Sequence, residues 1–254
     1  MQAIILAAGR GRRLWPLTAD NPKCLLPLHG RPLLAHQLDI LERHGVDDAL
    51  IVCSGGSARI RDLLAVRTGS LRPRCWYNPL ATVSDNLLSL WTVRRALADD
   101  LILVNGDVVF HPELLAGLLA VGGPATLTVS RQTSYSEDDM RVRMYDGRVL
   151  RVGKDLPGPD TDATSVGVMR FTGPGAAGLR RSLEAVTERP QAYRAYFLEA
   201  VQWLVDQGLP VTAWECGSLP WVDVDTPEDL DRARALGGRL GMEGTVARTP
   251  GGPT

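Results

Sequence analysis

The stretch Ala3-Ile4-Ile5-Leu6-Ala7-Ala8-Gly9-Arg10-Gly11-Arg12-Arg13 sets the expectation for the fold of this chain. Residues 3–7 form an apolar run that predicts a buried β-strand, and a loop with two glycines and three arginines follows at once. In α/β sheets, ligands bind beyond the carboxyl ends of the strands, and glycines let backbone N–H groups approach them closely. The loop therefore predicts a polyphosphate site, although a plain glycine turn with solvated arginines would have the same sequence.

Apolar runs and helix-like segments alternate through the first half of the chain. Strands are predicted at residues 3–7, 49–53, 74–77 and 101–105, and helices at residues 32–44, 58–66, 86–97 and 112–120. Such alternation indicates a parallel sheet with helices on both faces. The predicted fold class is therefore α/β, with a Rossmann-like mixed, mainly parallel sheet flanked by helices and an inserted β-rich portion.

The pattern changes after residue 122. Strands are predicted at residues 125–130, 141–145, 149–152, 165–171, 211–215 and 221–224, with helices at residues 175–186, 195–207 and from Thr226 onward. From Leu236, glycine and proline become frequent, which predicts a flexible tail over residues 236–254. We expect a single domain over residues 1–235, made of parts at about 1–122, 123–220 and 221–235.

The composition excludes several classes of protein. A net charge of −1 over 254 residues argues against a nucleic-acid partner, which would need a basic surface. No apolar run approaches the roughly 20 residues of a membrane span. The four cysteines show no CxxC spacing, so reduced thiols and a cytoplasmic location are expected. Only two lysines, Lys23 and Lys154, occur among the 28 Lys and Arg residues.

Two acidic segments are candidates for a metal site. Asp107 follows the buried run at residues 101–105, and Asp223 and Asp225 point the same way if their segment is extended. The alternatives are a turn aspartate after Gly106 and capping of the helix that starts at Thr226. Thr226 itself is a suitable N-cap, which leaves the two carboxylates partly free for other roles.

Residues 6–34 carry the most specific motif in the chain. They resemble the LAAGxGxRLxPLTxxxPKxLxPxxGxPLL signature of the sugar-phosphate nucleotidyltransferase superfamily. The matching positions are Leu6, Ala7, Ala8, Gly9, Gly11, Arg13, Leu14, Pro16, Leu17, Thr18, Pro22, Lys23, Leu25, Pro27, Gly30, Pro32, Leu33 and Leu34. Arg12 departs from the family pattern, which usually has Ser or Thr there.

The resemblance implies a nucleotide site and a metal site. In such enzymes the glycine loop surrounds the nucleotide, and residues matching Arg13 and Lys23 bind the triphosphate, where fixed cations stabilise the leaving pyrophosphate. The resemblance further implies that Asp107, Asp223 and Asp225 bind Mg²⁺, with Asp225 the first choice of the last two for direct contact. The residues expected to bind the nucleotide are Leu6, Ala7, Ala8, Gly9, Arg10, Gly11, Arg12, Arg13, Lys23, Ser84, Asn86, Gly106 and Asp107.

Residues 78–91 are similar to the NPxYxxTNNIYSLWxA segment of the branch that holds phosphocholine, inositol-phosphate and phosphonate cytidylyltransferases. Asp85 replaces the first Asn of that motif, and Ala81 stands where an aromatic is usual. The segment from Ser136 to Lys154 also resembles this branch, in which a lysine holds the acceptor phosphate. The expected acceptor-binding residues are Lys154, Asp85, Ser89, Arg131 and Tyr193, although Lys154 alone would also be explained as a surface lysine.

The resemblance predicts a Mg²⁺-dependent cytidylyltransferase. It would transfer CMP from CTP to a small phosphate or phosphonate. Lys23, Arg13 and Lys154 are the expected catalytic residues. A homodimer is compatible with the sequence. One alternative is a sugar-1-phosphate nucleotidyltransferase that uses UTP or dTTP. Another is a non-catalytic nucleotide-binding regulatory domain.

Overall fold

A nine-stranded mixed sheet forms the centre of the protein, in the strand order β5-β4-β1-β6-β11-β8-β12-β10-β9. The computed structural model describes residues 1–240. Four strands form the parallel half: β5 (Arg72–Tyr77), β4 (Asp48–Cys53), β1 (Gln2–Ala7) and β6 (Asp100–Asn105). This half contains the strands that the alternating pattern predicts, so the α/β class is what the structure has.

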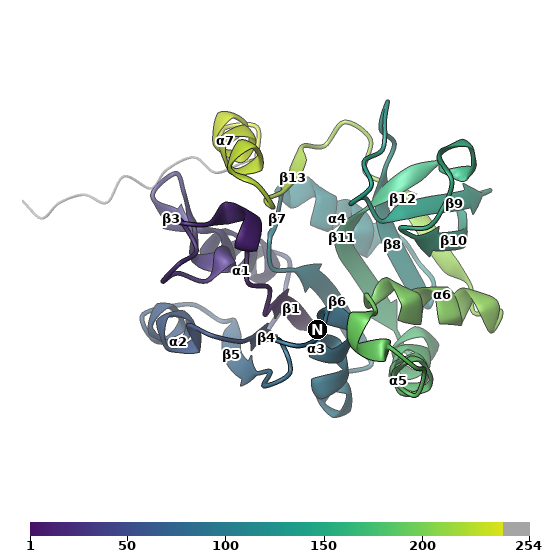
Figure 1. Ribbon diagram of the computed structural model, residues 1–254, viewed down its shortest axis with the longest axis horizontal. Helices are drawn as coiled ribbons and strands as arrows, with labels where there is room; N and C mark the ends of the chain where they lie inside the picture. Colours follow the sequence, from purple (N-terminus) through teal and green to yellow (C-terminus); the bar gives the residue numbers. More distant parts are fainter. Residues whose placement is uncertain (241–254) are drawn as a thin grey trace, which may run out of the picture.

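The β-rich second part continues the same sheet instead of forming a separate one (Figure 1). Strand β11 (Ala163–Thr172) lies antiparallel between β6 and β8 (Ala125–Ser130). The sheet then extends through β12 (Val211–Glu215), β10 (Arg148–Gly153) and β9 (Arg141–Tyr145). Because β11 pairs along both edges, the two halves share one core and hold each other in place.

Alternate residues of β1 face two different helix layers, as the period of two in a strand requires. Ile4 and Leu6 pack with the layer of α3 (Asn86–Thr92), α5 (Pro174–Thr187) and α6 (Leu198–Asp206). Ala3, Ile5 and Ala7 pack with the layer of α1 (Leu33–Arg43), α2 (Ser57–Ala65) and α4 (Pro112–Ala120). Both faces of the parallel half are therefore covered, and its ligand sites are restricted to the strand ends.

A third apolar cluster joins the two ends of the described chain. It contains Leu14 and Leu28 from the first segments, together with Val224, Leu230 and Leu240. The hairpin β2 (Pro27–Leu28) with β3 (Arg31–Pro32), the pair β7 (Val108–Phe110) with β13 (Trp221–Asp223), and helix α7 (Pro227–Ala235) surround this cluster. It fixes the segment at residues 221–225 beside the loop that follows β1.

Two expectations differ in detail from the structure. The helix expected at residues 86–97 ends at Thr92, and a short 3₁₀ turn at Arg94–Ala96 follows. The tail was expected from Leu236, but residues 236–240 continue the turn that ends α7, and Leu240 is buried. Residues 241–254 lie outside the described residues. Within residues 1–240, no helix has the length and hydrophobicity needed to cross a bilayer.

Candidate active site

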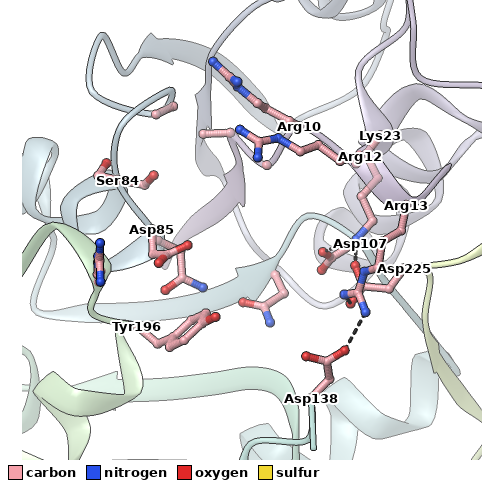
Figure 2. A pocket seen from close by; sticks show the side chains of 18 of the residues that line it. Arg10, Arg12, Arg13, Lys23, Ser84, Asp85, Asp107, Asp138, Tyr196 and Asp225 are labelled. Atoms are coloured by element: carbon pink, nitrogen blue, oxygen red, sulfur yellow. Dashed lines mark hydrogen bonds and ion pairs between the residues drawn. The ribbon is translucent and has the colours of Figure 1, made fainter. Parts of the chain in front are cut away.

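A cavity of about 630 Å³ opens at the carboxyl ends of β1 and β6 (Figure 2). Its wall includes the loop after β1, residues 81–86, the loop before β9, and the junction between η5 (Ala192–Arg194) and α6. Lys154 and the acidic residues Asp107, Asp223 and Asp225 also line it. A smaller hollow of about 100 Å³ adjoins it and is lined by Leu6, Ala7 and Gly106. All thirteen residues expected to bind nucleotide line one or both of these spaces.

Two glycines allow the close packing of this region. Gly11 has φ +58°, and an added Cβ would lie 2.9 Å from Cγ2 of Thr18 and 3.2 Å from Cβ of Lys23. An added Cβ at Gly106 would lie 2.8 Å from the backbone of both Leu6 and Ala7. The Gly106 N–H donates to the carbonyl oxygen of Leu6 at 3.0 Å. These contacts bring the end of β6, and with it Asp107, against the first loop.

Lys23 lies at the buried end of the cavity with 7% of its surface exposed. Its Nζ donates to Oδ2 of Asp107 at 2.6 Å and also to Oδ1 of Asp225. Burial by itself would lower the pKa of Lys23, but the charges of Asp107 and Asp225 outweigh burial and raise the pKa above its usual value. Lys23 is therefore a permanent cation, held at a fixed point beside the glycine loop.

Three carboxylates converge at this end, as the sequence predicts for Asp107, Asp223 and Asp225. Each offers an oxygen within 4.8 Å of the other two. Strand pairing explains the meeting, because Asp223 pairs with Val108 and the Val224 N–H donates to the Asp107 carbonyl oxygen at 3.1 Å.

One oxygen of this cluster lacks a partner. Oδ1 of Asp223 is buried without a hydrogen bond in the described part of the chain, and burial, followed by the charge of Asp107, raises the pKa of Asp223 well above its ordinary value. Both oxygens of Asp225, in contrast, accept from Lys23 and Arg13. An unpaired carboxylate oxygen beside two further carboxylates suits a hard divalent cation such as Mg²⁺.

Arg13 extends this charge arrangement toward the middle of the cavity. Its NH2 donates to Oδ2 of Asp225 at 2.7 Å, and its NH1 donates to Oδ2 of Asp138 at 2.6 Å. Oδ1 of Asp138 then accepts from Nζ of Lys154 at 3.3 Å. A continuous series of ion pairs thus connects Lys23 to Lys154, and so joins the two lysines of the chain.

The acceptor side shows both agreement and difference. Of the residues expected to bind the acceptor, Lys154, Asp85, Ser89 and Tyr193 line the cavity. The Lys154 ammonium lies 4.6 Å from the ring centre of Tyr196, a distance typical of cation–π contacts. The Asp85 N–H donates to the carbonyl oxygen of Tyr193 at 2.8 Å, which fixes both residues on one wall.

The structure does not bring Arg131 to the cavity. Its guanidinium donates to both carboxylate oxygens of Glu215 on β12, at 2.8 and 3.1 Å, on the exposed surface. Ser89 does line the cavity, but only 4% of its surface is exposed. Its Oγ already accepts a hydrogen bond from Nδ2 of Asn78 at 2.9 Å. We therefore see Ser89 mainly as part of the wall beneath the cavity.

Sequence reasoning left several lining residues out of the predicted site. The most important is Asp138, which bridges Arg13 and Lys154. The sequence did contain evidence for this residue, because Asp138 lies in the acidic segment that resembles the cytidylyltransferase branch. The other omitted residues are Ala81, Thr82, Val83, Asn105, Met140, Arg194 and Tyr196.

Known proteins resemble this chain over most of its length. The family described as MobA-like NTP transferase domain matches residues 3–208. CMP-5'-(3-aminopropyl)phosphonate synthase of Streptomyces rubellomurinus is 31% identical over 92% of the chain, and a bifunctional IPC transferase and DIPP synthase of Rubrobacter xylanophilus is 27% identical over 97% of it. The chain spans only 38% and 55% of the lengths of these two relatives.

Solved structures share the fold. The inositol-1-phosphate CTP transferase of T. maritima superposes with a TM-score of 0.78 at 21% identity, covering 94% of this chain and 95% of that one. The CTP:phosphocholine cytidylyltransferase of Streptococcus pneumoniae superposes with a TM-score of 0.75 at 21% identity, covering 92% and 98%. The resemblance and the mixed α/β fold predicted from the sequence are both confirmed. The chain belongs to the MobA-like NTP transferase family and is thus a nucleotidyltransferase.

Proposed function

We propose that this nucleotidyltransferase is a Mg²⁺-dependent cytidylyltransferase that transfers CMP from CTP to a small phosphate or phosphonate. The observation that carries the proposal is the placement of Lys23 and Lys154 on one cavity, joined through Asp225, Arg13 and Asp138. One lysine lies beside the glycine loop and three carboxylates, and the other lies beside Asp138 and Tyr196. The cavity therefore offers separate cations to two anionic substrates.

At the nucleotide end, the protein would bind the triphosphate through fixed positive charge. Lys23 is held in place by its ion pairs, and Arg10, Arg12 and Arg13 are exposed on the same cavity. Asp107, Asp223 and Asp225 would hold the Mg²⁺ ion, which when bound supplies charge neutralisation for the phosphates. Fixed cations stabilise the charge that develops on the departing pyrophosphate.

At the acceptor end, Lys154 would orient the phosphate or phosphonate of the second substrate. One acceptor oxygen forms a bond to the α-phosphorus, while the bond from that phosphorus to the bridging oxygen breaks and its electron pair leaves with pyrophosphate. The second pKa of a phosphate is near 6, so the attacking oxygen is already anionic and needs no general base. Catalysis would then come from position and electrostatics.

The choice of CTP and of the acceptor class draws on the relatives. The names of the Streptomyces relative and of the two solved structures contain CMP or CTP, with a phosphonate, inositol phosphate or phosphocholine as acceptor. These activities belong to those proteins, and they support the proposal through the shared fold and the matching motifs. A sugar-1-phosphate nucleotidyltransferase that uses UTP or dTTP is the main alternative.

A regulatory role without catalysis is the second alternative. A relative covering 45% of the chain is the ε subunit of translation factor eIF2B of Schizosaccharomyces pombe, at 34% identity. The intact carboxylate cluster and the orphaned Asp223 oxygen speak against this alternative, because a simple binding domain does not need a metal site.

The deciding experiment measures pyrophosphate release for each of CTP, UTP and dTTP with each of several acceptors. The acceptors are 3-aminopropylphosphonate, phosphocholine, inositol 1-phosphate and glucose 1-phosphate. Release with CTP and one of the first three supports the proposal, and release only with UTP or dTTP and glucose 1-phosphate overturns it. Nucleotide binding without release for every pair would favour the regulatory alternative. Binding of Mn²⁺, followed by electron paramagnetic resonance, tests the metal site without relying on activity.

A further inference from the structure

Among residues 1–240, Asp138 is the only residue that forms an ion pair with both Arg13, the cation of the nucleotide end, and Lys154, the cation of the acceptor end. Figure 2 shows its contact with Arg13. Its Oδ2 accepts from Arg13 at 2.6 Å and its Oδ1 accepts from Lys154 at 3.3 Å. Within residues 1–240, its carboxylate has no other hydrogen-bond donor. These two cations alone therefore determine where the Asp138 side chain lies.

The backbone on the carboxyl side of Asp138 is held much more firmly than its side chain. Two residues on, the carbonyl oxygen of Met140 accepts from the Ser165 N–H at 2.8 Å, and the Arg141 guanidinium donates to the carbonyl oxygen of Leu156 at 2.7 Å. The Asp138 side chain itself is 61% exposed, and that of Arg13 is 51% exposed. Exposed ion pairs contribute little to stability, so the side chain can be displaced without disturbing the fold.

We propose that Asp138 is a positioning residue that masks Lys154 until nucleotide binds. In the free protein, its carboxylate neutralises the cation that would bind the acceptor phosphate. A triphosphate on Arg13 would replace Asp138 as the partner of that guanidinium and would repel its negative charge. Once the triphosphate occupies Arg13, the Asp138 carboxylate also moves away from Lys154. The Lys154 ammonium then becomes available to the acceptor.

This inference rests on the proposed function, because it assumes a nucleotide at Arg13. Its consequence is a coupling between the two halves of the cavity: nucleotide and acceptor favour each other's binding by the same factor. Removing the charge of Asp138 should break the coupling and leave Lys154 available in the free protein. The inference therefore predicts a state of Lys154 that can be measured without an acceptor.

The lysine content of the chain makes the measurement simple. Lys154 and Lys23 are its only lysines, and Lys23 is buried, so limited acetylation by acetic anhydride followed by mass spectrometry reports on Lys154 separately. The rate depends on the fraction of free amine, which rises roughly tenfold for each unit by which the pKa of a lysine falls.

The experiment compares the wild-type protein, Asp138→Asn and Glu137→Gln, each with and without Mg²⁺ and α,β-methylene-CTP. Glu137 is the matched control, because it is exposed and makes no ion pair in the described residues. We expect the nucleotide analogue to speed acetylation of Lys154 severalfold in the wild type and in Glu137→Gln. Asp138→Asn should react fast already without nucleotide and should show little further increase.

Two outcomes overturn the proposal for Asp138 alone. One is equal acetylation of Lys154 in the wild type and in Asp138→Asn without nucleotide. The other is bound analogue, shown by calorimetry, that leaves the wild-type rate unchanged or lowers it. Failure of the analogue to bind at all would instead overturn the proposed function together with this inference, so the two failures are distinguishable.

Discussion

The Lys23 ammonium and the Asp107 carboxylate lie 2.6 Å apart although 84 residues separate them in the chain. The first follows β1 and the second follows β6, and these strands are parallel neighbours in the sheet. Asp107 lies directly after β6, whereas Lys23 lies in the 3₁₀ turn at Lys23–Leu25, which the chain reaches after the glycine loop. The ion pair therefore ties that turn to the end of β6. An electrostatic site built this way needs little rearrangement when its substrate arrives.

Replacing Lys23 should abolish the reaction. Lys23→Ala removes the buried cation, and Lys23→Arg places a larger, forked group in a space where the lysine stem already approaches Gly11. We expect pyrophosphate release to fall to background in both variants, while circular dichroism shows a folded protein. Turnover close to wild type in Lys23→Arg would show that any cation suffices at this position.

Removing a carboxylate from the cluster should remove metal binding and activity together. Asp107→Ala deletes one of three converging oxygens and one partner of Lys23. We expect Mn²⁺ affinity to drop by at least about tenfold, in line with the loss of a ligand, and pyrophosphate release to disappear. Asp162→Ala is a suitable control, because Asp162 accepts from the Met144 N–H away from the cavity. Unchanged Mn²⁺ binding in Asp107→Ala would mean that the metal lies elsewhere.

Gly106→Ala should separate the two strand ends that form the site. The new methyl group would lie 2.8 Å from Cα of Ala7, so the loop that carries Asp107 must move away from β1. We expect both a lower melting temperature and a large loss of kcat. Gly122→Ala serves as the control, because a Cβ added at Gly122 would have no other atom within 4 Å. Normal activity in Gly106→Ala would contradict the argument that this close approach positions Asp107.

Asp85 should influence the choice of acceptor. It lines the cavity without an ion-pair partner in the described chain, so its carboxylate can meet a cationic substituent. We expect Asp85→Asn to raise KM for 3-aminopropylphosphonate about tenfold or more, the scale of one charge-assisted hydrogen bond. The KM values for CTP and for 3-hydroxypropylphosphonate should change little. Equal effects on the amino and hydroxy acceptors would remove Asp85 from acceptor recognition.

Much of the site could be predicted because it lies at the ends of strands. Two apolar runs, at residues 3–7 and 101–105, each predict a buried strand. The sheet then fixes the positions of the residues that directly follow these strands. The motif around Lys23 then identifies the ligand class. In such segments local sequence and overall fold point to the same structure.

The remaining features depend on contacts that no local pattern reveals. Arg131 follows a strand as Asp107 does, but Glu215 on the neighbouring strand β12 binds its guanidinium. The helix expected at residues 86–97 ends at Thr92, and the Gln2 side chain hydrogen-bonds to the backbone of Ala96 and Ala98 beyond it, a contact between distant parts of the chain. Asp138 lies in a loop without periodicity, so its bridge between two cations appears only in three dimensions.

The pairing of β7 with β13 also has a consequence for the synthesis of this protein on the ribosome. Asp107 leaves the ribosome long before Asp223 and Asp225, which complete the carboxylate cluster from the far end of the domain. A chain released before residue 225 would display the glycine loop and Lys23 without two of the three carboxylates. If the proposed metal site is required for activity, we expect incomplete chains of this kind to release no pyrophosphate from a nucleotide.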